Sequence, residues 1–231
     1  MDLSNAIFDA FRLLVTVDPT LWGVIWVSLR VSLLALLIAT PLAIALGFLL
    51  ATVSFRGRRA VVIVLQSCLS FPTVVVGLVL YILLARSGPL GSLGLLYTQE
   101  AMVLGQAVIA FPVLTAFTLA AVQGVDRIVR ETALSLGASR SRAALTTLFE
   151  VRFALMAGLF NGFGRVISEV GCAMMVGGNI AGLTRNIPTA ISLETAKGEF
   201  AQGIALGFVL IVLALGINVS LNYFQGEGGM K

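Results

Sequence analysis

Two ionisable side chains lie inside an otherwise apolar stretch of this 231-residue chain. Arg165 and Glu169 are four residues apart, so on a helix their side chains would share one face and could form an ion pair. Charged groups in an apolar environment cost a few kcal/mol, and they usually face protein or water. Such a pair could neutralise itself inside the fold, place a cation beside a passing anion, or offer a carboxylate that takes up and releases a proton.

A second polar region runs from Asp126 to Arg142, between two long uncharged stretches. Apolar residues recur at helical spacing from Ile128 to Leu136, and Gly137 then supplies a natural helix terminator. Ser139 can cap a second helix. Two short helices joined at a glycine elbow would form a rigid knob. Its composition leaves two roles open: transmitting force to a partner, or lying on lipid head groups.

Several chemistries are excluded by the residues that the sequence lacks. There is no histidine, which removes bis-histidine haem ligation, histidine-containing zinc sites and Ser-His-Asp catalysis. The only lysines are Lys197 and Lys231, and neither follows the glycine-rich pattern of a P-loop. Cys68 and Cys172 fall in separate apolar stretches, where packing is their expected role. We predict a protein with no cofactor, no metal site and no catalytic residues of its own.

Composition places the chain in a lipid bilayer. Hydrophobic residues make up 58% of it and charged residues 11%, whereas a soluble domain carries about 25% charged residues. Backbone groups in lipid must pair within their own segment, and an odd number of stretches does not close a simple barrel, so we predict an all-α integral membrane protein. Each of five stretches reaches the ~20 residues needed to cross the hydrocarbon core. They are Trp22–Phe55, Ala60–Ala85, Ala101–Val125, Phe153–Gly178 and Phe200–Gln225.

Arginine and lysine residues set the predicted orientation, because short loops rich in them stay in the cytoplasm. Eight lie in or beside the loops after the first and third helices: Arg56, Arg58, Arg59, Arg127, Arg130, Arg140, Arg142 and Arg152. Four lie on the opposite side: Arg12, Arg86, Arg185 and Lys197. We expect five transmembrane helices in the cell membrane, with the N-terminus outside and the C-terminus cytoplasmic. The formal charge of +4 therefore reflects topology and does not indicate nucleic-acid binding.

The chain divides into a short N-terminal segment and one transmembrane domain. Residues 1–20 place apolar side chains at helical spacing and are expected to lie as an amphipathic segment on the outer interface. Residues 21–231 form the transmembrane domain, whose cytoplasmic loop covers about 126–150. Residues 177–199 mix glycines, hydroxyls and apolar side chains, so part of this outer segment is expected to fold back as a helix or gate.

Three prolines interrupt the predicted spans. Pro41, Pro72 and Pro112 each remove one backbone hydrogen bond and tend to kink a helix. A broken membrane helix usually borders a cavity or another helix that satisfies the freed carbonyl. Packing kinks explain Pro41 and Pro112, while Pro72 is equally open to a place on a transport pathway. Ser70 and Thr73 flank Pro72 and could supply hydroxyl donors there.

The segment Glu131-Thr-Ala-x-x-x-Gly137 resembles the E-A-A-x-x-x-G signature of ABC-transporter permeases, with Thr132 in place of the middle alanine. In that family the signature enters a cleft on the ATPase subunit. The resemblance implies that Glu131, Ala133 and Gly137 couple this chain to a separate ATPase. We extend the coupling set to the neighbouring side chains at the elbow: Leu136, Ala138 and Arg140.

Other segments narrow the resemblance to permeases for molybdate, tungstate and sulfate. The sequence from Phe71 to Leu78, Phe-Pro-Thr-Val-Val-Val-Gly-Leu, is similar to a stretch in those proteins. Ile167 to Gly171 and Leu193 to Phe200 most resemble the tungstate branch. The family implies a type I ABC importer permease core, a homodimer, two cytoplasmic ATPase subunits and an extracytoplasmic oxyanion-binding protein.

The prediction from these residues is a permease subunit of an ATP-driven importer for a tetrahedral oxyanion, with tungstate as the first candidate and molybdate or sulfate as alternatives. The candidate translocation pathway comprises Ser70, Pro72, Thr73, Arg165, Glu169 and Asn179. Two other functions stay open. One is a proton-coupled carrier that uses Glu169, and the other is a structural membrane anchor of a multisubunit complex.

Overall fold

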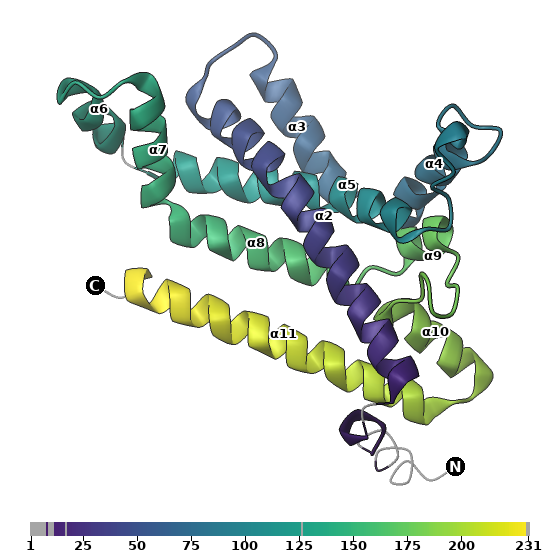
Figure 1. Cartoon of the computed structure of the whole chain (residues 1–231). Helices are drawn as coiled ribbons and strands as arrows, with labels where there is room; N and C mark the ends of the chain where they lie inside the picture. Colours follow the sequence, from purple (N-terminus) through teal and green to yellow (C-terminus); the bar gives the residue numbers. More distant parts are fainter. Residues whose placement is uncertain (1–7, 9–11, 17, 126, 230–231) are drawn as a thin grey trace.

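The computed structural model describes residues 8, 12–16, 18–125 and 127–229, and its regular elements within these ranges are all helices (Figure 1). The predicted amphipathic segment at residues 1–20 falls mostly outside the described residues. In chain order the elements are α2 (Pro19–Thr52), α3 (Arg58–Leu69), α4 (Thr73–Leu84), η1 (Gly91–Leu93), α5 (Gln99–Gln123), α6 (Arg127–Ser135), α7 (Arg140–Glu150), α8 (Arg152–Ile167), α9 (Gly171–Gly177), α10 (Ile187–Lys197) and α11 (Phe200–Gly229).

Three of the five predicted helices form close to their expected bounds, as α2, α5 and α11. The start of α2 is fixed by Asp18, whose carboxylate accepts the N–H groups of Thr20 and Leu21, both at 3.0 Å. Both α2 and α5 continue through a proline, at Pro41 and Pro112 respectively. The loss of one backbone hydrogen bond at each proline therefore does not end either helix.

The second predicted helix, Ala60–Ala85, is wrong as a single helix. Its residues form α3 and α4, which are bent by 100° relative to one another. Pro72 is the N-cap residue of α4, with extended backbone angles of φ −61° and ψ 122°. Proline has no N–H to donate, and it disfavours helical angles at the preceding residue, Phe71. Pro72 therefore separates two helices and is more than a kink within one.

The fourth predicted helix, Phe153–Gly178, is also broken, between α8 and α9. Ser168 follows α8, and its Oγ donates to the Gly164 carbonyl oxygen at 2.8 Å. The Glu169 carboxylate accepts the N–H of Cys172, near the start of α9, at 3.1 Å. These side chains bind backbone groups on both sides of the break, so the chain can leave and re-enter the helical conformation there.

The most extensive packing among the described helices joins α2 to α5. Their shared core uses small buried side chains, among them Ala35, Ala39 and Ala110. Gly47 approaches α5 so closely that a Cβ added to it would lie 2.6 Å from the Cβ of Thr118. A second cluster packs the start of α2 against α10 and the start of α11. Small residues at such contacts let helix backbones approach in a membrane protein, where van der Waals packing drives association.

The helices place two distinct ends on the molecule (Figure 1). The α6–α7 hairpin and the C-terminal end of α11 lie at one end, and α10 lies at the other with the starts of α2 and α11. The expected folding-back of residues 177–199 is confirmed, because this segment contains α10. Its start is anchored to α2 by a bond in which the Ile187 N–H donates to the Ser28 Oγ at 2.7 Å.

By length and composition, three described helical segments could each cross a bilayer alone: α2, α5 and residues Phe200–Ile217 of α11. Two bent pairs, α3 with α4 and α7 with α8, raise the number to five if each pair counts as one span. The number five agrees with the upper end of this range, but the predicted fourth span, Phe153–Gly178, covers α8 and α9 instead of α7 and α8. The chain is a multi-pass membrane protein built on long apolar helices.

Candidate functional sites at the polar hairpin and the embedded ion pair

The α6–α7 hairpin turns at Gly137, as its sequence predicted. The N–H of Gly137 donates to the Leu134 carbonyl oxygen, and the N–H of Ala138 donates to that of Ala133, both at 3.0 Å. This pair of bonds is a Schellman motif, which requires a left-handed residue at its centre. Gly137 supplies it with φ +84°. A Cβ at this position would meet open space, so the glycine is required by the backbone angle and not by crowding.

The second helix of the hairpin is capped by Ser139, also as predicted. Its Oγ accepts the N–H of Arg142 at 3.3 Å and lies 3.0 Å from the Oγ of Ser141. An N-cap of this kind satisfies one of the free N–H groups at the start of a helix. Backbone and side-chain bonds therefore hold both sides of the elbow, which makes the hairpin a rigid projection.

The predicted coupling residues are mostly accessible on this projection. Leu136 is 83% exposed at its tip. Glu131, Gly137 and Arg140 are exposed, while Ala133 and Ala138 are half-buried. An apolar side chain so exposed at the tip of a polar hairpin is available for contact with a partner.

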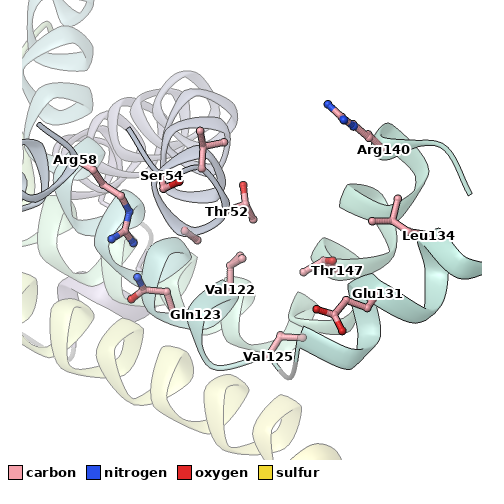
Figure 2. A pocket seen from close by; sticks show the side chains of 12 residues that line it. Thr52, Ser54, Arg58, Val122, Gln123, Val125, Glu131, Leu134, Arg140 and Thr147 are labelled. Atoms are coloured by element: carbon pink, nitrogen blue, oxygen red, sulfur yellow. The ribbon is translucent and has the colours of Figure 1, made fainter. Parts of the chain in front are cut away.

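A cavity of about 870 Å³ separates the hairpin from the ends of α2 and α5 (Figure 2). Arg58 stands on one wall and Arg140 on the opposite wall, and the carboxylate of Glu131 points into the space between them. Arg58 is held in place because its Nε donates to the Leu50 carbonyl oxygen at 2.6 Å. The lining also includes hydroxyl groups from Thr52, Ser54 and Thr147.

The predicted ion pair forms, although not in the middle of a helix as expected. Arg165 lies in the last turn of α8 and Glu169 lies in the break before α9. Arg165 Nη1 donates to Glu169 Oε2 at 3.1 Å, and Glu169 Oε1 accepts the Cys172 N–H. The Glu169 side chain is 2% exposed and that of Arg165 is 41% exposed. The carboxylate is therefore buried and bonded through both oxygens, while much of the guanidinium remains accessible.

The other predicted pathway residues fall into separate places. Thr73 and Arg165 line one cavity of about 340 Å³, beside the break between α3 and α4. Pro72 forms that break, and Ser70 is exposed next to it without lining the cavity. Asn179 lies apart, in the segment between α9 and α10, and its Nδ2 donates to the Thr189 carbonyl oxygen at 3.4 Å. The structure therefore brings Thr73 together with Arg165 and leaves Asn179 elsewhere.

Two polar residues of this region were not among the site residues predicted from the sequence. Asn161 and Ser168 are exposed on the same helical face as Arg165, and all three line a groove of about 550 Å³ between α8 and α11. The signal was present in their spacing of four and then three residues, which places them on one side of a helix. Within the described residues, no cluster of three or more His, Cys, Asp or Glu side chains is placed to hold a metal ion.

A family model agrees with this arrangement. The model described as "Binding-protein-dependent transport system inner membrane component" matches residues 43–226, which include both the hairpin and the ion pair. The chain belongs to this family. The resemblance to ABC-transporter permeases that was inferred from the Glu131–Gly137 segment is confirmed, and so is the type I importer fold class.

Individual relatives cover nearly the whole chain. A tungstate uptake system permease protein from Campylobacter jejuni is 41% identical over 216 residues, which are 92% of this chain and 90% of that protein. One from Peptoclostridium acidaminophilum is 38% identical over 218 residues, or 94% of this chain and 96% of that protein. The structure of a bacterial alginate ABC transporter in complex with its alginate pentasaccharide-bound periplasmic protein has a TM-score of 0.74 at 22% identity, covering 93% of this chain and 82% of that chain. This last likeness supports the fold.

Proposed function

We propose that this chain is the membrane-spanning permease subunit of an ATP-driven importer for tungstate, in which a separate ATPase hydrolyses the nucleotide. The observation that carries the proposal is the rigid, exposed α6–α7 hairpin, in a chain whose family is that of binding-protein-dependent transport components. The choice of tungstate is supported by relatives with 38% and 41% identity over more than nine-tenths of the chain. Molybdate and sulfate are the competing substrates, because they share the tetrahedral shape and the double negative charge.

The hairpin has the properties that mechanical coupling needs. Its tip presents Leu136 to solvent, and its elbow is fixed by the bonds across Gly137. Because α7 leads directly into α8, a push on the hairpin passes to the helix that carries Arg165. We place this end in the cytoplasm, with the N-terminus outside, since the loops there carry most of the arginines.

The proposed assembly is a homodimer with two cytoplasmic ATPase subunits and an extracytoplasmic oxyanion-binding protein. A tetrahedral dianion cannot enter hydrocarbon, so it needs a protein-lined route that opens to one side at a time. We assign Thr73 and Arg165 to that route, with Glu169 as the counter-charge and Pro72 as the break that opens the wall. Ser70 extends the route on the α3 side, and Asn179 belongs to its outer end beside α10.

A proton-coupled carrier that uses Glu169 agrees less well with the geometry. A titrating carboxylate must exchange protons with water on each side in turn, yet Glu169 is buried and both of its oxygens accept hydrogen bonds. A purely structural anchor leaves the capped, exposed hairpin without a role. Both readings remain distinguishable by experiment.

The experiment is oxyanion uptake into liposomes that contain the purified chain and its ATPase, with the binding protein outside. Uptake of tungstate that requires ATP and survives a protonophore supports the proposal. Uptake that needs a proton gradient and does not depend on ATP supports the proton-coupled carrier. Copurification with a partner other than an ATPase supports the structural anchor. Molybdate and sulfate are assayed in parallel, because their relative uptake decides the substrate.

A further inference from the structure

Three polar residues lie on one side of α8 and the turn that follows it, in a groove whose other lining residues, among them Phe160, Leu210 and Ile211, are mostly apolar. These three, Asn161, Arg165 and Ser168, are all exposed. The rise of an α-helix is about 1.5 Å per residue, so these seven residue steps extend over about 10 Å. Asn161 Nδ2 donates to the Ala157 carbonyl oxygen at 2.9 Å, which uses one of the two N–H groups of that amide.

Such a face does not suit contact with lipid tails. An exposed guanidinium is strongly disfavoured in hydrocarbon, so it faces water or protein. Arg165 is 13 residues from Arg152 at the start of α8, which corresponds to about 20 Å along the helix. With Arg152 taken as the cytoplasmic boundary that the arginine distribution predicts, this distance places Arg165 inside a hydrocarbon core about 30 Å thick.

Arg165 also stands between two hollows. It lines the cavity of about 340 Å³ beside Thr73 and the groove of about 550 Å³ that Asn161 and Ser168 share. A guanidinium has five N–H donors in a planar fork. Within the described residues, its side-chain contact is the single bond from Nη1 to Glu169 at 3.1 Å. The remaining donors are free to bind a ligand with several acceptor oxygens.

We propose that Asn161, Arg165 and Ser168 form a binding surface for the tetrahedral oxyanion within the membrane, and that Glu169 competes with the anion for Arg165. The Ser168 hydroxyl, which donates to the Gly164 carbonyl oxygen at 2.8 Å, would turn its proton to the anion. This inference rests on the proposed function and adds the residues that hold the substrate midway. A dianion held by an isolated arginine would bind tightly and leave slowly, and conduction requires binding weak enough for release. Glu169 limits the affinity for the anion, because its negative charge repels the approaching anion. When the anion leaves, the carboxylate pairs again with the Arg165 guanidinium.

The first test measures tungstate bound to the purified permease–ATPase complex, without binding protein, by equilibrium dialysis and elemental analysis. Glu169→Gln removes the charge but keeps an oxygen that can accept from Arg165 or Cys172. We expect tungstate to bind about tenfold tighter or more in this variant, because the repulsion is gone. Lys197→Gln removes an exposed cation elsewhere and should bind tungstate like wild type. Unchanged affinity in Glu169→Gln would overturn the competition.

The second test separates substrate binding from a purely structural pair. The double variant Arg165→Gln with Glu169→Gln leaves no unpaired buried charge, so its folding is preserved. We expect its ATP-driven tungstate uptake to fall about tenfold or more, as loss of a charged hydrogen bond implies. If the pair only stabilises the fold, the double variant will import like wild type and the inference is wrong. If wild type itself imports no oxyanion with ATP, the proposed function fails and the inference falls with it.

The third test asks whether the α8 face meets water. Ser168→Cys, in a background where Cys68 is replaced by alanine, should react with a charged thiol reagent, and tungstate should slow that reaction. Ser168→Ala should lower uptake, while Ser220→Ala on α11 should leave uptake unchanged. A cysteine at 168 that stays unreactive, or that cross-links to a second copy instead, would show that lipid or the partner covers this face and would overturn the proposal.

Discussion

The α6–α7 hairpin and the Arg165–Glu169 pair are both polar, yet they are stabilised in opposite ways. In the hairpin, local backbone bonds across Gly137 and a serine cap fix the shape, while the tip side chain of Leu136 is 83% exposed. At the break between α8 and α9, an ion pair and a carboxylate–backbone bond hold the chain, and Glu169 is 2% exposed.

This difference predicts different consequences for variants in the two regions. Because the shape of the hairpin depends on local backbone bonds, its exposed side chains can be substituted without loss of the fold. A buried charge cannot lose its partner in the same way, because the remaining charge stays desolvated. Variants at the hairpin should therefore impair coupling in a folded protein, whereas loss of Arg165 alone should impair the fold as well, because it leaves the charged Glu169 buried without a partner.

The largest effect is expected for Arg165→Ala. It leaves the Glu169 carboxylate buried without its counter-charge, and breaking a buried pair in this way costs about 3–5 kcal/mol. The expected result is a low yield of monodisperse protein and a lower unfolding temperature in detergent.

Lys197→Ala is the matched control for that variant. Lys197 Nζ lies 3.2 Å from Glu194 Oε1, but its side chain is half exposed and Arg185 also faces the same carboxylate. Glu194 is buried like Glu169, but it keeps Arg185 Nη1 at 3.9 Å as a second counter-charge when Lys197 is lost. We therefore expect a smaller loss of stability for Lys197→Ala than for Arg165→Ala. Equal stability of the two variants would contradict the view that Glu169 depends on Arg165 alone for its counter-charge.

The next effect concerns Gly137→Val. A side chain at φ +84° is strained by about 1–2 kcal/mol, while the space around the position is open. We expect the chain to insert and fold, but stimulation of the partner's ATP hydrolysis by the loaded binding protein to be lost, because the elbow changes its angle.

Gly216→Val provides the comparison, since Gly216 also faces open space but has no positive φ. It should keep stimulated ATP hydrolysis near the wild-type rate. If Gly137→Val couples as well as Gly216→Val does, the hairpin does not transmit force through its elbow.

A smaller effect is expected for Leu136→Ser, which removes the exposed apolar tip without changing the turn. Truncation of a central interface side chain often costs about 1–2 kcal/mol, so the permease should bind its ATPase roughly fivefold to thirtyfold more weakly. The affinity is measured by titrating purified ATPase onto the permease in lipid nanodiscs. Leu93→Ser, which changes an exposed leucine of η1 outside the hairpin, should leave this affinity unchanged.

The smallest effect is expected for Ser139→Ala. Loss of this N-cap should destabilise α7 by about 1 kcal/mol, seen as faster amide hydrogen exchange in its first turn. Ser135→Ala is the comparison, because the Ser135 Oγ donates to the Thr132 carbonyl oxygen inside α6 and caps no helix start. Similar exchange in both variants would mean that the cap does not hold the elbow.

Local chemistry made the hairpin predictable from the sequence. Gly137 and Ser139 act on backbone groups only a few residues away, so their types and spacing specify the turn whatever surrounds it. The spacing of Arg165 and Glu169 likewise predicted their contact. The apolar runs that became α2, α5 and α11 were readable because membrane helices satisfy their own backbone bonds.

The interrupted helices were harder to predict. Apolar residues predominate on both sides of Ser70–Pro72 and of Ser168–Val170, so the sequence predicts a single span across each region. The exposure of Asn161 and Ser168 was likewise hidden, because a polar residue in an apolar run can face lipid, protein or a cavity. Burial depends on neighbours from distant parts of the chain, and the sequence pattern does not contain them.

The sequence by itself determined that the chain spans a membrane, that a glycine-turned hairpin projects from it, and that an arginine and a glutamate pair within it. Only the tertiary structure decided where two spans break and which member of the ion pair stays accessible. The physical reason is the distance along the sequence over which the interactions act. Turns and caps depend on bonds between near neighbours, whereas breaks and exposure depend on contacts such as that of the Ile187 N–H with the Ser28 Oγ, which joins α10 to α2.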